Sequence, residues 1–110
     1  VLVIDSTLST ANQRTKIYID GTYYIDLSGT AITQNATIGT VSTDTNIGRA
    51  SGSAPGYFSG KLDEVAIFDY ALSARQIKQD IYNATTSGKT ADLNNNSNLT
   101  APIAWYRMGD

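Results

Sequence analysis

Cysteine and histidine are both absent from the 110 residues of this chain. Without thiols or imidazoles the chain can form no disulfide, no zinc site built from Cys or His, and no catalytic site that needs a Cys nucleophile or a His general base. A metal ion bound by this chain would have to be a hard cation held by oxygen atoms. Glutamate occurs only once, at Glu64, which limits carboxylate chemistry as well.

The sequence also has neither a marked excess of basic or acidic residues nor an extended apolar segment. Eight basic residues stand against ten acidic ones, the formal net charge is −2, and no run of Lys and Arg occurs. We therefore expect no nucleic acid as a partner. No stretch approaches 18 apolar residues, so no membrane span is predicted. A chain of this length can bury one hydrophobic core, which indicates one domain or part of one.

Small polar residues dominate what is present. Thr, Ser, Gly and Asn make up more than a third of the chain and cluster between short runs of apolar, β-branched and tyrosine residues. This spacing is typical of an all-β sandwich with antiparallel strands. The predicted strands are residues 1–5, 16–20, 23–27, 36–41, 45–50, 57–59, 61–69 and 103–108, and they leave room for one helix.

A short α-helix is predicted near residues 73–83. Ser73 and Gln76 have the spacing of a capping box, and Leu72 and Ile77 flank it as a hydrophobic staple does. We expect a helix of about three turns packed on a sheet. Its apolar stripe would be Ala74, Ile77 and Ile81, with Arg75, Lys78 and Asp80 facing water.

The first hairpin turns at Asp20 and Gly21, which by default predict a two-residue loop. Such a loop would place the apolar residues of the two strands on opposite faces of the sheet. A loop with an odd number of residues would collect them on one face, so we predict the odd loop. The apolar face would then carry Ile17, Ile19, Tyr23, Ile25 and Leu27, and the other face Lys16, Tyr18, Tyr24 and Asp26.

Three regions are predicted along the chain. Residues 1–82 form the β-sandwich portion, and residues 83–101 are a polar linker or surface loop. Residues 102–110 are strand-like and contain the single tryptophan, Trp105. They are either the closing strand of this domain or the opening strand of a following repeat.

Several motifs in fixed order resemble one family. They are KIYIDG (residues 16–21), NIGRAS (46–51) and YFSGKLDEVAIFDYALSARQI (57–77). Together they resemble the laminin G-like branch of the concanavalin A-like lectin/glucanase superfamily over residues 1–82. The resemblance implies an antiparallel two-sheet jelly-roll sandwich. The usual opening strands do not precede Val1, whereas IAWYRMGD (103–110) resembles such a strand, so we expect the sandwich to be partial or permuted.

Catalysis is not expected. Glycoside hydrolysis on this fold would require two carboxylates about 5–9 Å apart. The nearest match, Asp63 and Glu64, consists of adjacent strand residues whose side chains point to opposite faces. We interpret them as strand-edge residues that make hydrogen bonds or ion pairs, and keep a glycoside hydrolase remnant only as the least favoured alternative.

A calcium ion is the one cofactor considered. Asp63 is in phase with the apolar Val65 and Ile67, so it needs a partner if it is buried. Arg49 is one candidate partner. The resemblance suggests calcium as the other, because laminin G-like and pentraxin-like relatives often bind it through carboxylates and carbonyls. The oxygen ligands would then come from Asp44, Asn46 and Asp63.

Exposed tyrosines are the candidate ligand-binding residues. An aromatic plate packs against the C–H face of a sugar ring while neighbouring polar groups bind its hydroxyls. The candidates are Tyr18 and Tyr24, predicted to point away from the core, together with Tyr57 and Arg49. Ordinary half-buried sheet tyrosines are the alternative.

These observations predict a non-catalytic laminin G-like, lectin-like module of an extracellular, cell-surface or virion protein, including phage particles. Its role would be adhesion, carbohydrate binding or assembly, with a polysaccharide or glycan as one expected partner. The alternative is a purely structural virion or fibre protein. Because the sandwich lacks strands and exposed sheet edges need cover, other protein chains or further copies of this chain are expected partners too.

Overall fold

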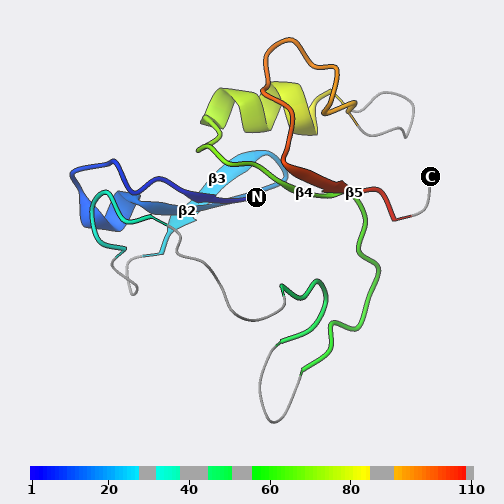
Figure 1. The fold of residues 1–110 in the computed structure, drawn as a ribbon, viewed down its shortest axis with the longest axis horizontal. Helices are drawn as coiled ribbons and strands as arrows, with labels where there is room; N and C mark the ends of the chain where they lie inside the picture. Colours follow the sequence, from blue (N-terminus) through cyan, green and yellow to red (C-terminus); the bar gives the residue numbers. More distant parts are fainter. Residues whose placement is uncertain (28–31, 38–44, 51–55, 85–90, 109–110) are drawn as a thin grey trace.

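The computed structural model describes residues 1–27, 32–37, 45–50, 56–84 and 91–108, and every structural statement below concerns these residues. They form five strands and two short helices (Figure 1). The strands are β1 (Leu2–Ile4), β2 (Thr15–Ile19), β3 (Thr22–Asp26), β4 (Val65–Ile67) and β5 (Ala104–Tyr106), and the helices are η1 (Ala11–Gln13) and η2 (Gln76–Tyr82). No described helix is both long enough and apolar enough to cross a membrane.

The strands form two antiparallel sheets, which confirms the predicted fold class. One sheet has the order β1-β2-β3, and the other pairs β4 with β5. The arrangement is mostly β, with little helix, as expected for part of an antiparallel sandwich. Of the predicted strand 36–41, residues 38–41 lie outside the described residues. The predicted strands 45–50 and 57–59 meet only in an isolated bridge between Arg49 and Tyr57.

The predicted odd loop between β2 and β3 is wrong. Ile19 pairs with Thr22, and Asp20 and Gly21 both have positive φ, 50° and 68°, as a two-residue type I′ turn requires. A register shift follows, so that Tyr18 pairs with Tyr23 but Ile17 pairs with Ile25. The residue between Tyr23 and Ile25 is therefore an extra residue in β3, a β-bulge. Because of the bulge, Ile17 still lies opposite Ile25, which is the alignment that an odd loop would have produced.

The core lies on the opposite face of this sheet from the one predicted. Tyr18 is only 7% exposed and shares a buried cluster with Val3, Leu72 and Ile77. The prediction that Tyr18 points away from the core is therefore wrong. Tyr18 is buried because the helix η2 covers the face of the sheet that carries Val3 and Tyr18 (Figure 1).

The apolar face predicted to be the core is exposed instead. Leu2, Ile17 and Ile25 lie in one row across the three strands. Leu2 is 59% and Ile25 46% exposed, and no described element packs over them as η2 packs over Tyr18. An apolar sheet face of this kind is the inner surface of a sandwich whose second layer the described residues do not supply.

The helix begins where the sequence predicts. The capping box is formed: the Gln76 N–H donates to Ser73 Oγ at 3.2 Å, and the Ser73 N–H donates to Gln76 Oε1 at 3.0 Å. The helix type differs from the prediction, because Gln76–Tyr82 has π-helical geometry, and the Asn83 N–H donates to the Lys78 carbonyl, five residues earlier. Of the predicted apolar stripe, Ile77 is fully buried and Ile81 is half-buried, but Ala74 is exposed.

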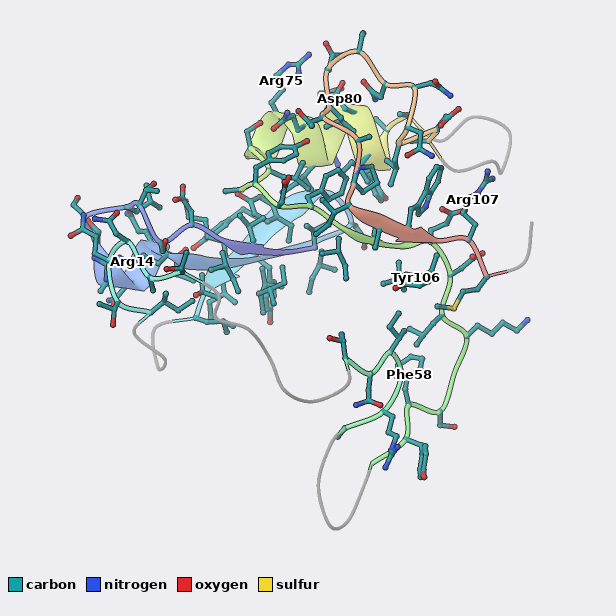
Figure 2. The ribbon with its side chains drawn as sticks, in the orientation of Figure 1. Arg14, Phe58, Arg75, Asp80, Tyr106 and Arg107 are labelled. Carbon is teal, nitrogen blue, oxygen red and sulfur yellow. The ribbon has the colours of Figure 1, made fainter. Side chains whose placement is uncertain are left out.

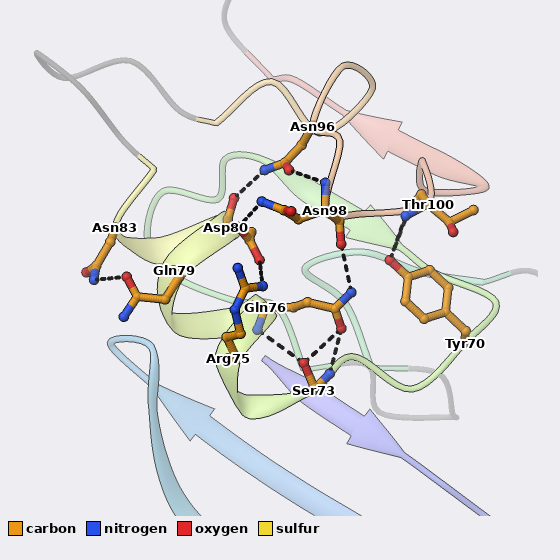
Figure 3. A network of polar contacts seen from close by, with 10 residues as sticks. All are labelled: Tyr70, Ser73, Arg75, Gln76, Gln79, Asp80, Asn83, Asn96, Asn98 and Thr100. Carbon is orange, nitrogen blue, oxygen red and sulfur yellow. Dashed lines mark hydrogen bonds and ion pairs between the residues drawn. The ribbon is translucent and has the colours of Figure 1, made fainter.

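Asp80 does not face water as predicted, for it is only 6% exposed. Its carboxylate accepts from Arg75 Nη1 and from Asn98 Nδ2, each at 2.9 Å (Figure 3). Its backbone carbonyl accepts from Asn96 Nδ2 at 3.2 Å. A buried carboxylate needs such partners, and two of them, Asn96 and Asn98, come from a loop 16–18 residues away that no helical periodicity could indicate.

The described part of the Asn-rich segment, residues 91–100, lies against the helix as a surface loop. Gln76 Nε2 donates to the Asn98 carbonyl at 3.0 Å, and the Tyr70 hydroxyl bonds with the backbone of Thr100 (Figure 3). Ala91 and Leu93 are buried. The loop leads into β5, which pairs with β4 of the same chain. The boundaries at residues 82 and 101 stay predictions.

Replacing Asp80 by Ala should lower the free energy of unfolding by about 1–3 kcal/mol, because Asn98 and Arg75 lose their buried acceptor. Urea denaturation followed by Trp105 fluorescence measures this loss. Asp92→Ala is the matched control, since Asp92 is exposed and accepts only from Asn94 and Asn95 within its own loop. Equal destabilisation by the two variants would contradict the role given to Asp80.

Candidate ligand-binding site

A projecting hairpin holds two of the predicted site residues. The Ala50 N–H donates to the Gly56 carbonyl at 2.9 Å, and the Phe58 N–H donates to the Gly48 carbonyl at 2.8 Å. These two bonds flank Arg49 and Tyr57, which are therefore directly opposite as a non-hydrogen-bonded pair. In such a pair the Cβ atoms lie about 4.5–5.5 Å apart and both side chains leave the same face. Figure 2 shows Phe58 on this segment, away from the sheets.

Both side chains are accessible. Tyr57 is 73% exposed, and Arg49 is exposed as well. The ion pairs of the described residues are Arg75–Asp80 and Arg107–Glu64, so Arg49 takes part in neither. An aromatic face beside a guanidinium group can receive a sugar ring and hydrogen-bond its oxygen atoms.

The structure does not bring the other two predicted tyrosines to this hairpin. Tyr18 is packed in the core, so its ring contacts the protein and not solvent. Tyr24 is 65% exposed and is the extra residue of the β3 bulge, within the three-stranded sheet. Of the three candidate tyrosines, Tyr57 is the one that the described residues place opposite a cation, in the isolated bridge with Arg49.

The predicted calcium ligands are only partly described. Asp44 lies outside the described residues, and Asn46 is exposed. Asp63 is exposed, and its Oδ1 accepts the Glu64 N–H at 2.9 Å; among the described residues it forms no ion pair with Arg49. No group of three or more acidic side chains gathers in the described part of the chain. Calcium binding stays a prediction.

Glu64 joins the base of the hairpin segment to β5. Its Oε2 accepts from Trp105 Nε1 at 2.5 Å, and its Oε1 pairs with Arg107 Nε at 3.4 Å. The Arg107 guanidinium also stacks over the Trp105 ring, 4.9 Å from its centroid. The interpretation of Glu64 as a residue that makes hydrogen bonds and ion pairs is confirmed, but Glu64 is not a strand residue as predicted, because its φ is 54° and β4 begins at Val65. Its partners are 41 and 43 residues away, beyond the reach of any local spacing rule.

A groove of about 1290 Å³ runs between β1 and β4. Apolar side chains such as Leu2, Val65 and Ile103 line it, and Glu64, Asp5 and Asp69 contribute carboxylates. Glu64 is engaged with Trp105 and Arg107, and Asp5 accepts from the hydroxyl and N–H of Thr7. The contacts of Glu64 and Asp5 are those of structural residues rather than of an acid and base pair for glycoside hydrolysis.

The comparison with known families agrees with the fold. The laminin G-like model of the concanavalin A-like lectin/glucanases superfamily matches residues 2–78. The chain belongs to this family. Laminin G-like domains are generally non-catalytic, lectin-like in fold and typically extracellular. No curated protein and no solved structure matches the chain.

The contact between Glu64 and Trp105 in this laminin G-like domain predicts a graded loss of stability. Glu64→Ala should lower the free energy of unfolding by about 1–3 kcal/mol because the half-buried Trp105 N–H loses its acceptor. Glu64→Gln keeps an acceptor oxygen and loses only the charge, so we expect a smaller loss. Urea denaturation and the Trp105 emission maximum report both effects.

Asp63→Ala is the control for this series, since Asp63 is exposed and bonds only to the next N–H. A Glu64→Ala variant as stable as the wild type would show that β5 is held by its backbone bonds alone.

Proposed function

We propose that this chain is a non-catalytic, lectin-like module of an extracellular, cell-surface or virion protein that binds carbohydrate at the projecting hairpin. The observation that carries the proposal is the exposed cross-strand pair of Arg49 and Tyr57. The lectin-like superfamily of the chain supports the same class of ligand.

The geometry of the pair suits a sugar ring. The Tyr57 ring offers an apolar plate, and Arg49, whose guanidinium group has five N–H donors for ring or exocyclic oxygen atoms, leaves the same face of the bridge. A tyrosine plate loses little side-chain entropy on binding because it rotates about only two side-chain bonds. A single shallow pair of this kind supports weak binding, as expected of a module that acts in several copies.

Replacement of Tyr57 by Ala should abolish binding on a glycan array, because it removes the plate on which the ring packs. Phe58→Ala is the matched control: Phe58 is 57% exposed, is the next residue of the same strand, and leaves the opposite face. We expect its binding to match that of the wild type. Equal loss in both variants, or no binding by the wild type to any glycan, would overturn the proposal.

An assembly role is the second candidate, and a different surface favours it. Val1 bonds to Tyr18 of β2, and the Asp5 N–H donates to the carbonyl of Arg14, the residue before β2, so the backbone groups of Leu2 and Ile4 face the edge of β1 that pairs with no other described strand. This edge carries no charge or proline within Leu2–Ile4 to block pairing. The radius of gyration is 15.2 Å, whereas a compact chain of this length has about 13 Å.

A second copy of the chain is the occupant that this edge fits. Two β1 strands can pair antiparallel about a two-fold axis at Val3, so that Leu2 of each copy exchanges both backbone bonds with Ile4 of the other. The exposed apolar faces of the two sheets then become continuous. The interface is isologous, and it closes as a dimer.

Ile4→Lys should convert this dimer to a monomer in sedimentation equilibrium, because a charge on an edge strand opposes pairing. Leu62→Lys is the control, since Leu62 is 39% exposed but lies outside β1 and the sheets. A wild-type chain that sediments at 11.8 kDa at all accessible concentrations would rule out the assembly role.

A further inference from the structure

Gly48 comes directly before Arg49, the residue that the bridge places opposite Tyr57. From its left-handed backbone and its bond to the other side of the hairpin, we infer that Gly48 is a positioning residue of the site. It acts through the backbone, by holding Arg49 in register with Tyr57, and needs no contact with the ligand. The inference rests on the proposed function, but the register itself can be measured without any ligand.

Two glycines supply the carbonyls of the bonds beside the bridge. The Gly48 carbonyl accepts the Phe58 N–H at 2.8 Å, and the Gly56 carbonyl accepts the Ala50 N–H at 2.9 Å. In the described residues the bridge is isolated and belongs to no longer strand pair, so its alignment depends on these two bonds. Loss of either bond would leave the two sides of the hairpin free to shift against each other.

The bond made by Gly48 depends on an unusual backbone conformation. Its φ is 75°, whereas Gly56 does not have a positive φ. A residue with a Cβ atom disfavours positive φ, because the Cβ atom then lies too close to a backbone carbonyl oxygen. A return to negative φ would rotate the Gly48 carbonyl relative to the preceding chain and away from the Phe58 N–H. Gly48 therefore needs to be glycine for the register to form, and Gly56 does not.

The space around the two glycines supports the same distinction. A Cβ atom at Gly48 would lie 3.1 Å from Leu62 Cδ1, while a Cβ atom at Gly56 would meet no atom within 4 Å. Leu62 is 39% exposed, so the end of its side chain can move aside and the steric cost at Gly48 is small. The requirement for glycine at position 48 therefore comes from the backbone conformation rather than from lack of space.

The test measures register and binding separately on the full chain. The Cα atoms of a non-hydrogen-bonded pair are about 4.5 Å apart, so the Hα atoms of Arg49 and Tyr57 should give a strong nuclear Overhauser effect (NOE). A glycan array probed with a dilution series of the protein measures binding. Gly48→Ala should lose this NOE and bind about five- to thirtyfold more weakly, because the aligned conformation becomes a minor one.

Two further variants isolate the backbone effect. Gly56→Ala is the matched control and should keep both the NOE and the binding. Gly48→Asn places the same Cβ atom beside Leu62 as Gly48→Ala does, but asparagine tolerates positive φ better, as Asn35 does here with a φ of 59°. It should recover most of the NOE and of the binding. Because the hairpin lies outside the buried cluster, Trp105 emission and melting temperature should stay unchanged in all three variants.

The outcomes separate the register from the proposed function. If Gly48→Ala keeps the NOE, or if Gly48→Asn loses as much as Gly48→Ala, the left-handed backbone does not set the register and the inference is wrong. It is also wrong if Gly48→Ala loses the NOE but binds as the wild type does, because the site then needs no alignment. If the wild type binds no glycan, the proposed function fails, while the NOE series still decides whether Gly48 sets the register.

Discussion

Packing of the helix η2 on one face of the β1-β2-β3 sheet is the interaction on which the rest of the structure depends. Ile77 is fully buried there, and it shares its cluster with Val3, Tyr18 and Leu72. Each of these side chains comes from a different segment, so the cluster joins the first hairpin to the second half of the chain. The helix can pack there because the capping box fixes where it begins.

This one-sided core explains how the hairpin site is held. The hairpin segment lies between β3 and β4, outside the buried cluster, and Glu64 fixes its far end to Trp105 of β5. Strand β5 in turn follows the Asn-rich loop, which Asp80 and Gln76 bind to the helix. The position of the site thus depends on a series of polar contacts that connects Glu64, through β5 and the Asn-rich loop, to helix η2.

Local features were predictable from the sequence, and long-range ones were not. The capping box of Ser73 and Gln76 depends on residues three apart, and it forms as predicted. The buried face of the first sheet was assigned wrongly, because a bulge at Tyr24 and a helix arriving from residues 76–82 decide it. Neither the bulge nor the docking of the helix changes the hydrophobic periodicity of the strand sequence, so this periodicity could not predict them.

The candidate site shows the same division. Arg49 and Tyr57 were each singled out for their chemistry, but their pairing depends on a backbone register that composition does not specify. The register matters because it turns two ordinary surface residues into one site.

The β1 edge is a separate surface, so self-association would leave the hairpins of both copies free. A dimer that presents two weak sites binds a polymer far more tightly than one site does, since the second contact is intramolecular. The two candidate functions are therefore compatible, and assembly would strengthen carbohydrate binding.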